Sequence, residues 1–183
     1  MYSFPAHLDD APRMGQFMVE TWLEAHRGQV PDDQWRRRRE QWTPDLSAAG
    51  WANTLREMVD GTRTRTCIYL ACDPAGIDIH GLVMGVPARH GPWEDAAQIA
   101  ALYVHQSRRR EGLGRGLLQI AVGDLIGRGF ERLIIGCLDT NTPGLRFYEH
   151  LGGVVVGHVE DEEYGFSSTQ VLFGWPDIST LAM

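Results

Sequence analysis

The sequence predicts one α+β domain with a mixed sheet flanked by helices, and three observations lead to that fold class. Apolar residues recur at helical spacing in the first third of the chain, whereas shorter apolar or alternating segments broken by Pro, Gly and Asp follow Gly61. The chain has no internal repeat and no segment that could serve as a linker between two domains. We therefore expect residues 1–183 to form a single domain with a full hydrophobic core.

Three helices are expected in the first third, over 9–28, 31–42 and 47–61. Acidic residues and a proline near the start indicate where the first two begin, because acids favour the positive end of a helix and proline lacks the N–H that this end leaves unpaired. Ser47 is the expected cap of the third helix, and Gly61 is its expected stop.

Six strands and two further helices are expected after Gly61. Short apolar runs mark the strands, and the turn at 73–76 predicts that the first two strands form a hairpin. A strong apolar stripe at helical spacing precedes Gly129, which indicates an amphipathic helix that ends there. The expected strands are 66–72, 79–86, 97–105, 131–138, 153–159 and 168–174, and the expected helices are 113–128 and 143–151.

The composition excludes several classes of function. All 17 of the Lys and Arg residues are arginines, because the chain contains no lysine. A Walker A phosphate loop and a pyridoxal phosphate enzyme both need a lysine, so both are excluded. The formal net charge of −7 argues against binding to nucleic acid or to an anionic membrane, and it favours a cationic partner.

The sequence also carries an expectation about location. Its three cysteines have neither the spacing of a disulfide framework nor that of a zinc site, which favours a reducing compartment. The first residues lack the basic start and apolar core of a targeting segment, and no apolar run is long enough to cross a bilayer. We expect a cytoplasmic protein without a membrane or metal partner.

The segment 102–116 is the most informative part of the chain. It joins an expected buried strand to the amphipathic helix, and its glycines allow the backbone to approach a ligand closely. Backbone N–H groups at a helix N-terminus bind phosphate, and Arg109, Arg110 and Arg115 add positive charge. A Rossmann dinucleotide fingerprint would need a third glycine where Leu117 stands, so we reject it. A purely structural glycine turn remains the alternative.

Two motifs in this region resemble those of the GNAT superfamily of acyl-CoA-dependent N-acyltransferases. Arg109-x-x-Gly112-x-Gly114, after the strand 102–104, is similar to the family's (Gln/Arg)-x-x-Gly-x-(Gly/Ala) signature. The segment that begins at Asn141 is similar to the second motif, Asn-x-x-Ala-x-x-Phe-Tyr-Glu-x-x-Gly-Phe, and it reads Asn141-x-x-Gly144-x-x-Phe147-Tyr148-Glu149-x-Leu151-Gly152. The resemblance implies a twisted, mostly antiparallel sheet of six to seven strands, with the cofactor motif in 97–129 and the second motif in 131–153.

The resemblance also implies a donor and the residues that bind it. The donor is acetyl-CoA, whose pantetheine arm pairs with the strand 102–104 and whose pyrophosphate lies on the amides of 109–114. Tyr148 matches a tyrosine that protonates the departing thiolate, which a phenol can do. The implied binding residues are Leu102, Tyr103, Val104, Arg109, Arg110, Glu111, Gly112, Leu113, Gly114, Arg115, Asn141 and Tyr148.

The base that would deprotonate the acceptor amine is less clear. Many family members have a glutamate where this chain has Gln98, and an amide cannot accept an ammonium proton. Glu94 and Asp95 are the nearest acids in sequence, and we take Glu94 as the candidate catalytic base. His105 follows the strand directly and is interpreted as a turn residue. Arg110 is a second departure, because the family commonly has glycine there.

The acceptor predicted by the sequence is the primary amine of a small cationic molecule. The densest acidic run of the chain, 160–163, falls between the last two strands, where the family builds its acceptor pocket, and it would attract a cation. Trp22, His26, Gln98 and Glu162 are the candidate substrate-binding residues. Acetylation of antibiotics, of protein N-termini or of lysines, and a non-catalytic acyl-CoA-binding module, stay open, as does a homodimer.

Overall fold

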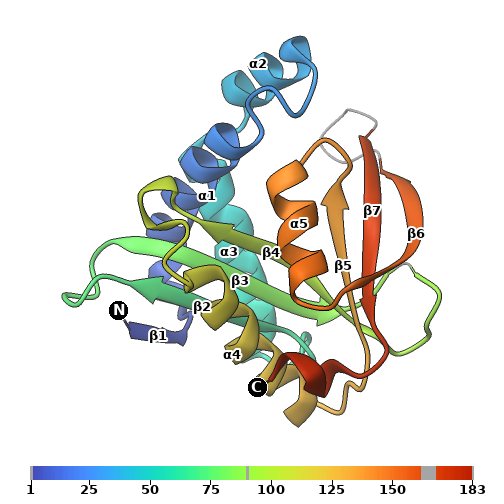
Figure 1. The fold of residues 1–183 in the computed structure, drawn as a ribbon. Coiled ribbons are helices and arrows are strands. Elements are labelled where there is room, and N and C mark those ends of the chain that lie inside the picture. Colours follow the sequence, from blue (N-terminus) through green and yellow to red (C-terminus); the bar gives the residue numbers. More distant parts are fainter. Residues whose placement is uncertain (1, 90, 162–167, 183) are drawn as a thin grey trace.

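A seven-stranded mixed sheet lies at the centre of the computed structural model, which describes residues 2–89, 91–161 and 168–182 (Figure 1). The strand order is β1-β2-β3-β4-β5-β7-β6, and every neighbouring pair is antiparallel except β4 and β5. The prediction of a mixed, mostly antiparallel sheet flanked by helices is therefore confirmed. No helix in the described ranges is long and apolar enough to cross a membrane.

The elements follow the predicted order along the chain. The strands are β1 Tyr2–Pro5, β2 Cys67–Cys72, β3 Ile79–Pro87, β4 Ala97–Val104, β5 Leu133–Leu138, β6 Val154–Asp161 and β7 Ser168–Trp175. The α-helices are α1 Ala11–Ala25, α2 Asp32–Gln41, α3 Pro44–Val59, α4 Leu113–Gly127 and α5 Thr142–His150. Short 3-10 helices occur at Leu8–Asp10, Gln106–Arg108 and Ile178–Leu181.

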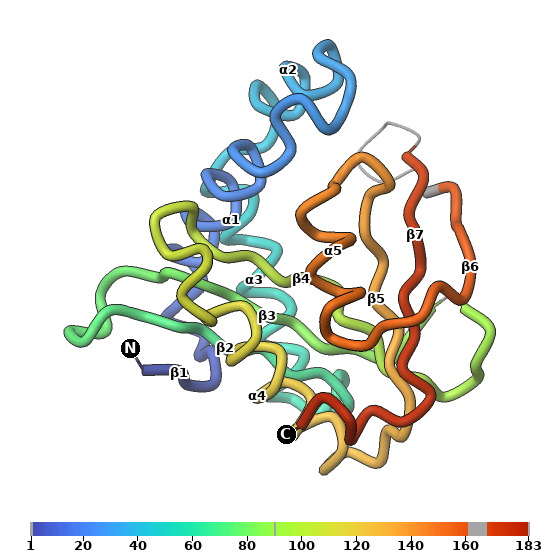
Figure 2. Tube along the Cα trace, in the orientation of Figure 1, coloured from blue at the N-terminus to red at the C-terminus, as the bar shows by residue number. Residues whose placement is uncertain are grey.

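Helices cover both faces of the sheet (Figures 1 and 2). The apolar stripe predicted for α4 is buried on one face, where it packs with residues of β2 to β5 and β7 and with Tyr148 of α5. Helices α1 and α3 pack on the opposite face against β2 and β3. Helix α2 projects from the end of α1 and has no fully buried residue.

The start of one helix and the presence of one strand differ from the prediction. The third helix begins at Pro44 and not at Ser47, because Thr43 is the residue that caps it, with its side chain accepting a hydrogen bond from the backbone N–H of Leu46. Ser47 lies buried within the helix. The strand β1 is not among the predicted strands, because it is a short edge strand that contains a proline.

The parallel pair β4 and β5 is the feature that positions the site. The two strands pair at only three positions, the last of which is Ile99 opposite Ile135. Both strands continue beyond that point without pairing with each other, and Figure 1 shows them running apart. Ala100 has no partner on β3, where the register shifts, so β4 carries a β-bulge where it leaves β5.

Gly15 tests the close packing of α1 on α3. A Cβ atom at Gly15 would lie 2.5 Å from the carbonyl oxygen of Pro44 and 2.6 Å from the backbone nitrogen of Ala48. These backbone atoms can move only if α3 shifts, so we expect Gly15→Ala to reduce the free energy of unfolding by about 1–3 kcal/mol. Gly50 of α3 has no atom within 4 Å of such a Cβ, so Gly50→Ala is the control and should raise stability by about 0.5–1 kcal/mol. The free energy of unfolding of both variants is measured by thermal and urea unfolding. Equal changes for Gly15→Ala and Gly50→Ala would contradict this packing.

Candidate active site

The candidate site begins at the opening between β4 and β5. From Ala101 to Val104 the β4 side chains are half-buried, because no strand covers that edge. Leu102 and Val104 pack towards α4, while Ala101 and Tyr103 lie on the face of α1. The unpaired edge of β4 leaves its backbone groups available for an extended ligand, as the predicted pantetheine contact at Leu102, Tyr103 and Val104 requires.

The loop after β4 ends in a helix N-terminus suited to phosphate. Gly112 occupies the N-cap of α4 with a φ of 81°, a conformation that favours glycine, and no side chain caps the helix. The N–H groups of Leu113, Gly114 and Arg115 have no carbonyl to bind within the helix. These groups and the positive end of the helix dipole fit an anionic diphosphate.

Arg110 shows why the family commonly has glycine at this position. Its φ is 68°, a left-handed conformation that costs a residue with a Cβ on the order of 1 kcal/mol. This conformation places an arginine two residues before the N-cap of α4. Glu111, also implied as a binding residue, forms an ion pair with Arg108, at a distance of 3.8 Å.

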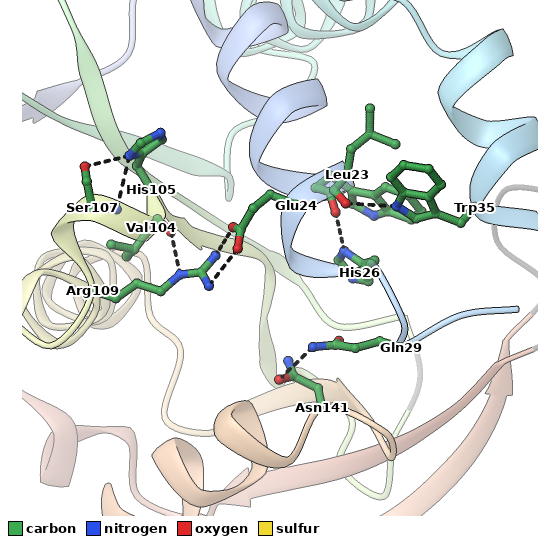
Figure 3. A network of polar contacts seen from close by, with 11 residues as sticks. Leu23, Glu24, His26, Gln29, Trp35, Val104, His105, Ser107, Arg109 and Asn141 are labelled. Carbon is green, nitrogen blue, oxygen red and sulfur yellow. Dashed lines mark hydrogen bonds and ion pairs between the residues drawn. The ribbon is translucent and has the colours of Figure 1, made fainter. Parts of the chain in front are cut away.

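Arg109 does not point freely into the opening. Its Nε donates a hydrogen bond to the carbonyl oxygen of Val104 at 3.2 Å. Its two terminal nitrogens bind the carboxylate of Glu24 near the end of α1, one of them at 3.2 Å from Oε1. Arg109 therefore joins the phosphate loop to α1 (Figure 3).

Asn141 makes a second link, to Gln29 in the segment that follows α1. Its Oδ1 accepts a hydrogen bond from the N–H of Gly144 at 3.1 Å, which caps α5, and one from Nε2 of Gln29 at 3.5 Å. The Thr140 hydroxyl donates to the carbonyl oxygen of Gln29 at 2.9 Å. The segment 24–29 is thus held on both sides of the opening, by the loop after β4 and by the loop after β5 (Figure 3).

His26 lies within that segment. Its ring stacks on Trp22, with centroids 4.3 Å apart and planes 16° apart, and its centroid is 6.1 Å from that of Tyr103. Its Nδ1 is 2.9 Å from the carbonyl oxygen of Trp22. Burial lowers the pKa of His26 below its ordinary value, and the bond to Trp22 and the charge of Glu24 oppose that shift only in part.

Trp22 supports this arrangement and offers little surface of its own. It is 4% exposed, and its ring makes a T-shaped contact with Trp42, with centroids 5.9 Å and planes 88° apart. The guanidinium of Arg38 lies 4.0 Å from the Trp42 ring centroid and 5.7 Å from that of Trp22. Arg38 is thus part of an aromatic cluster, whereas Arg36, Arg37 and Arg39 are exposed.

Tyr148 lies on the opposite side of the opening from His26. It belongs to α5 and packs against Phe147, Phe173 and Trp175, with ring centroids 5.2, 5.7 and 6.4 Å away. Burial, with a smaller contribution from Cys137, raises the pKa of its phenol well above the usual range. The phenol therefore keeps its proton at every pH at which the protein would work.

The remaining predicted residues are separated from this group. Gln98 is half-buried on β4 and faces away from α4, because its neighbours Ala97 and Ile99 face α4. Glu94 is exposed in the loop before β4, at the end where β4 and β5 are paired. Glu162 lies outside the described residues. The structure thus brings His26, Tyr103, Arg109 and Asn141 around the opening, but it does not bring Glu94 there.

Glu24 and Gln29 also lie at the candidate site, and the sequence does not predict them there. Glu24 meets a partner 85 positions along the chain, and Gln29 meets one 112 positions along it. Neither residue belongs to a motif, and on a helix surface such side chains are common, so the sequence contains no signal that would have identified them.

Comparisons with known proteins agree with the geometry. The model of the "Acetyltransferase (GNAT) family" matches residues 19–153. The "Uncharacterized N-acetyltransferase YuaI" of Bacillus subtilis (strain 168) is 24% identical over 180 residues, which are 96% of this chain and 93% of the relative.

Solved structures show the same fold. The PaiA N-acetyltransferase of Thermoplasma acidophilum, in complex with coenzyme A, aligns with a TM-score of 0.70 and 13% identity over 94% of this chain and 96% of that one. The putative acetyltransferase yncA of Salmonella typhimurium, with its cofactor acetyl-CoA, aligns with a TM-score of 0.65 and 17% identity over 96% of this chain and 92% of that one.

The cysteines provide a test of burial near the site. All three are buried, and burial raises the pKa of Cys67 and of Cys137 to about 11. The reactive thiolate is therefore scarce at neutral pH, and we expect iodoacetamide to alkylate the folded protein more than about 100-fold more slowly than the unfolded chain. Peptide mass spectrometry with and without guanidinium checks this rate. Fast labelling of Cys137 in the folded protein would contradict it.

Proposed function

The chain belongs to the GNAT acetyltransferase family, and from that premise we propose that it transfers the acetyl group of acetyl-CoA to the primary amine of a small cationic molecule. The transfer is direct, with the donor thioester and the amine bound together. The observation that supports this proposal most is the opening between β4 and β5, which lies next to an uncapped helix N-terminus and has a buried phenol on one side and a histidine on the other.

Residues on both sides of the opening would hold the donor. The backbone of Leu102 to Val104 would pair with the pantetheine arm, and the first amides of α4 would bind the pyrophosphate. Arg110 and Arg115 would add charge there. Arg109 would exchange its contact with Glu24 for a phosphate oxygen, and an exposed ion pair of this kind costs only about 0–1 kcal/mol to break.

A direct attack needs no protein nucleophile, and the cysteines support this. Cys137 is the one on the strand that borders the opening, and its raised pKa keeps it in the unreactive thiol form. Binding both reactants in one cleft can by itself lower the barrier by several kcal/mol. Tyr148 would then protonate the thiolate that leaves the acetyl group.

The preference for a cationic acceptor rests on charge. The chain has a formal net charge of −7, and the acidic run 160–163 begins with the last two residues of β6, Glu160 and Asp161. Such a concentration of negative charge raises the encounter rate of a cationic amine. Residues 162 and 163 of this run lie outside the described part of the chain. The preference for a cationic acceptor is therefore tested by the amine panel below.

A panel of amines tests the proposed function. The protein is incubated with acetyl-CoA and with spermidine, kanamycin, tryptamine or a peptide bearing a free N-terminal alanine and an internal lysine. We expect thiol detection to record CoA release with one of the small cationic amines, and mass spectrometry to identify a mono-acetylated product. Release with the peptide alone would assign the protein-acetylating alternative. Tight acetyl-CoA binding without release for any amine would contradict transfer and favour a binding module.

Tyr148→Phe tests the general acid. The variant keeps the packed ring and removes the hydroxyl, so we expect kcat to fall by about 10–100-fold while the Kd for acetyl-CoA changes by less than about twofold. Tyr69→Phe is a matched control, because Tyr69 is a phenol on β2 whose hydroxyl binds Asp124, 3.1 Å away. An unchanged kcat in Tyr148→Phe would exclude the role.

A further inference from the structure

We infer that His26 accepts the proton of the acceptor's ammonium group, through its Nε2 atom. The inference rests on the proposed function and deepens it, since the family's usual glutamate is replaced here by Gln98, which cannot act as a base. Three observations carry it: the tautomer of the ring, its charge, and its position across the opening between β4 and β5.

The tautomer of His26 follows from its hydrogen bond. Nδ1 lies 2.9 Å from the carbonyl oxygen of Trp22, and a carbonyl oxygen can only accept, so Nδ1 carries the hydrogen. A neutral imidazole has one protonated nitrogen, and the lone pair is therefore on Nε2. Stacking on Trp22 fixes the plane of the ring. The ring is thus held with one nitrogen able to receive a proton.

The charge state suits a base at neutral pH. Burial favours the neutral ring and is the largest cause of the lowered pKa of His26. Among the residues that the structure describes, the neighbouring groups are the carboxylate of Glu24 on α1, the phenol of Tyr103 on β4 and, beyond Trp22, the guanidinium of Arg38 on α2. Glu24 would hold a newly formed imidazolium by its charge, although its own contact with Arg109 weakens that effect.

The position of His26 follows from the two links that hold 24–29. Glu24 is bound to the loop after β4 through Arg109, and Gln29 is bound to the loop after β5 through Asn141 and Thr140. His26 lies between these two links in the chain, and Figure 3 shows its ring in the space between α1 and the Gln29–Asn141 pair. Its ring approaches Tyr103 of β4 on the face away from Tyr148.

The proton balance is complete with these two residues. The ammonium gives one proton to Nε2 of His26, which passes it to solvent, and the neutral amine then forms its bond to the acetyl carbon. When the carbon–sulfur bond breaks, the sulfur takes the proton of Tyr148. The nitrogen loses its second proton, which restores the phenol. The products are the amide, coenzyme A as the thiol, and one proton in solution.

The first experiment reads the ring directly and needs no substrate. Nitrogen-15 NMR of uniformly labelled protein, with His26 assigned from the difference between the wild type and His26→Asn, reports the tautomer and the pKa. We expect a hydrogen on Nδ1 and a titration below 6.5, the ordinary histidine value. A hydrogen on Nε2 at neutral pH, or a pKa above 6.5, would overturn the inference whatever the enzyme acetylates.

The second experiment measures kcat/KM as a function of pH with the panel amine that releases CoA fastest. Asn at 26 can still donate to the Trp22 carbonyl from its δ position, but it has no basic nitrogen. In the wild type we expect kcat/KM to rise up to the pKa of His26 and then to stay level until the free amine loses its own proton. In His26→Asn we expect a value about 100-fold lower at pH 7 that keeps rising to the pKa of the amine.

Controls separate this inference from folding and from the proposed function. His7→Asn makes the same exchange at an exposed histidine ahead of α1 and should keep the wild-type profile. Unchanged acetyl-CoA affinity and unfolding temperature in His26→Asn show that the fold and donor site persist. A wild-type profile in His26→Asn would refute the role of His26 while leaving transfer intact, whereas a panel without any CoA release would refute the proposed function.

Discussion

The short parallel pairing of β4 and β5 is the constraint on which the rest of the structure depends. Three residue pairs join the strands, and a bulge at Ala100 turns β4 away directly after them. Each strand is still anchored, because β4 pairs with β3 on both sides of the bulge and β5 pairs with β7. The sheet can therefore open between β4 and β5 without losing its core, and Tyr148 and His26 lie towards its two opposite faces.

The segment 24–29, which contains the end of α1 and the residues after it, connects the two sides of the candidate site. Its contacts with Arg109 and Asn141 involve the same side chains that the family motifs assign to the donor. These contacts are partly exposed to solvent and individually weak, so a phosphate or an amide of the donor can replace them at small cost. The proposed donor binding by Arg109 and Asn141 would therefore be coupled to the position of His26 through one segment of six residues.

Burial also determines the environment of Tyr148, the proposed general acid. Gly153 stands where the family motif has an aromatic residue. The indole of Trp175, from β7, fills that space: a Cβ on Gly153 would lie 2.7 Å from its ring, and its Nε1 donates to the carbonyl of Leu151 at 3.1 Å. The same ring packs on Tyr148, so the packing that replaces the missing aromatic also keeps the phenol buried and protonated.

The sequence by itself determined the class of fold, the order of the elements after Gly61 and the glycine turn that begins α4, because apolar spacing and glycine positions act over a few residues. It placed Gly112 and Arg109 correctly beside the start of α4. Only the tertiary structure decided what lies across from them. Glu24 and Gln29 reach partners far along the chain, and the tautomer of His26 depends on how the end of α1 folds, so local pattern contains neither result.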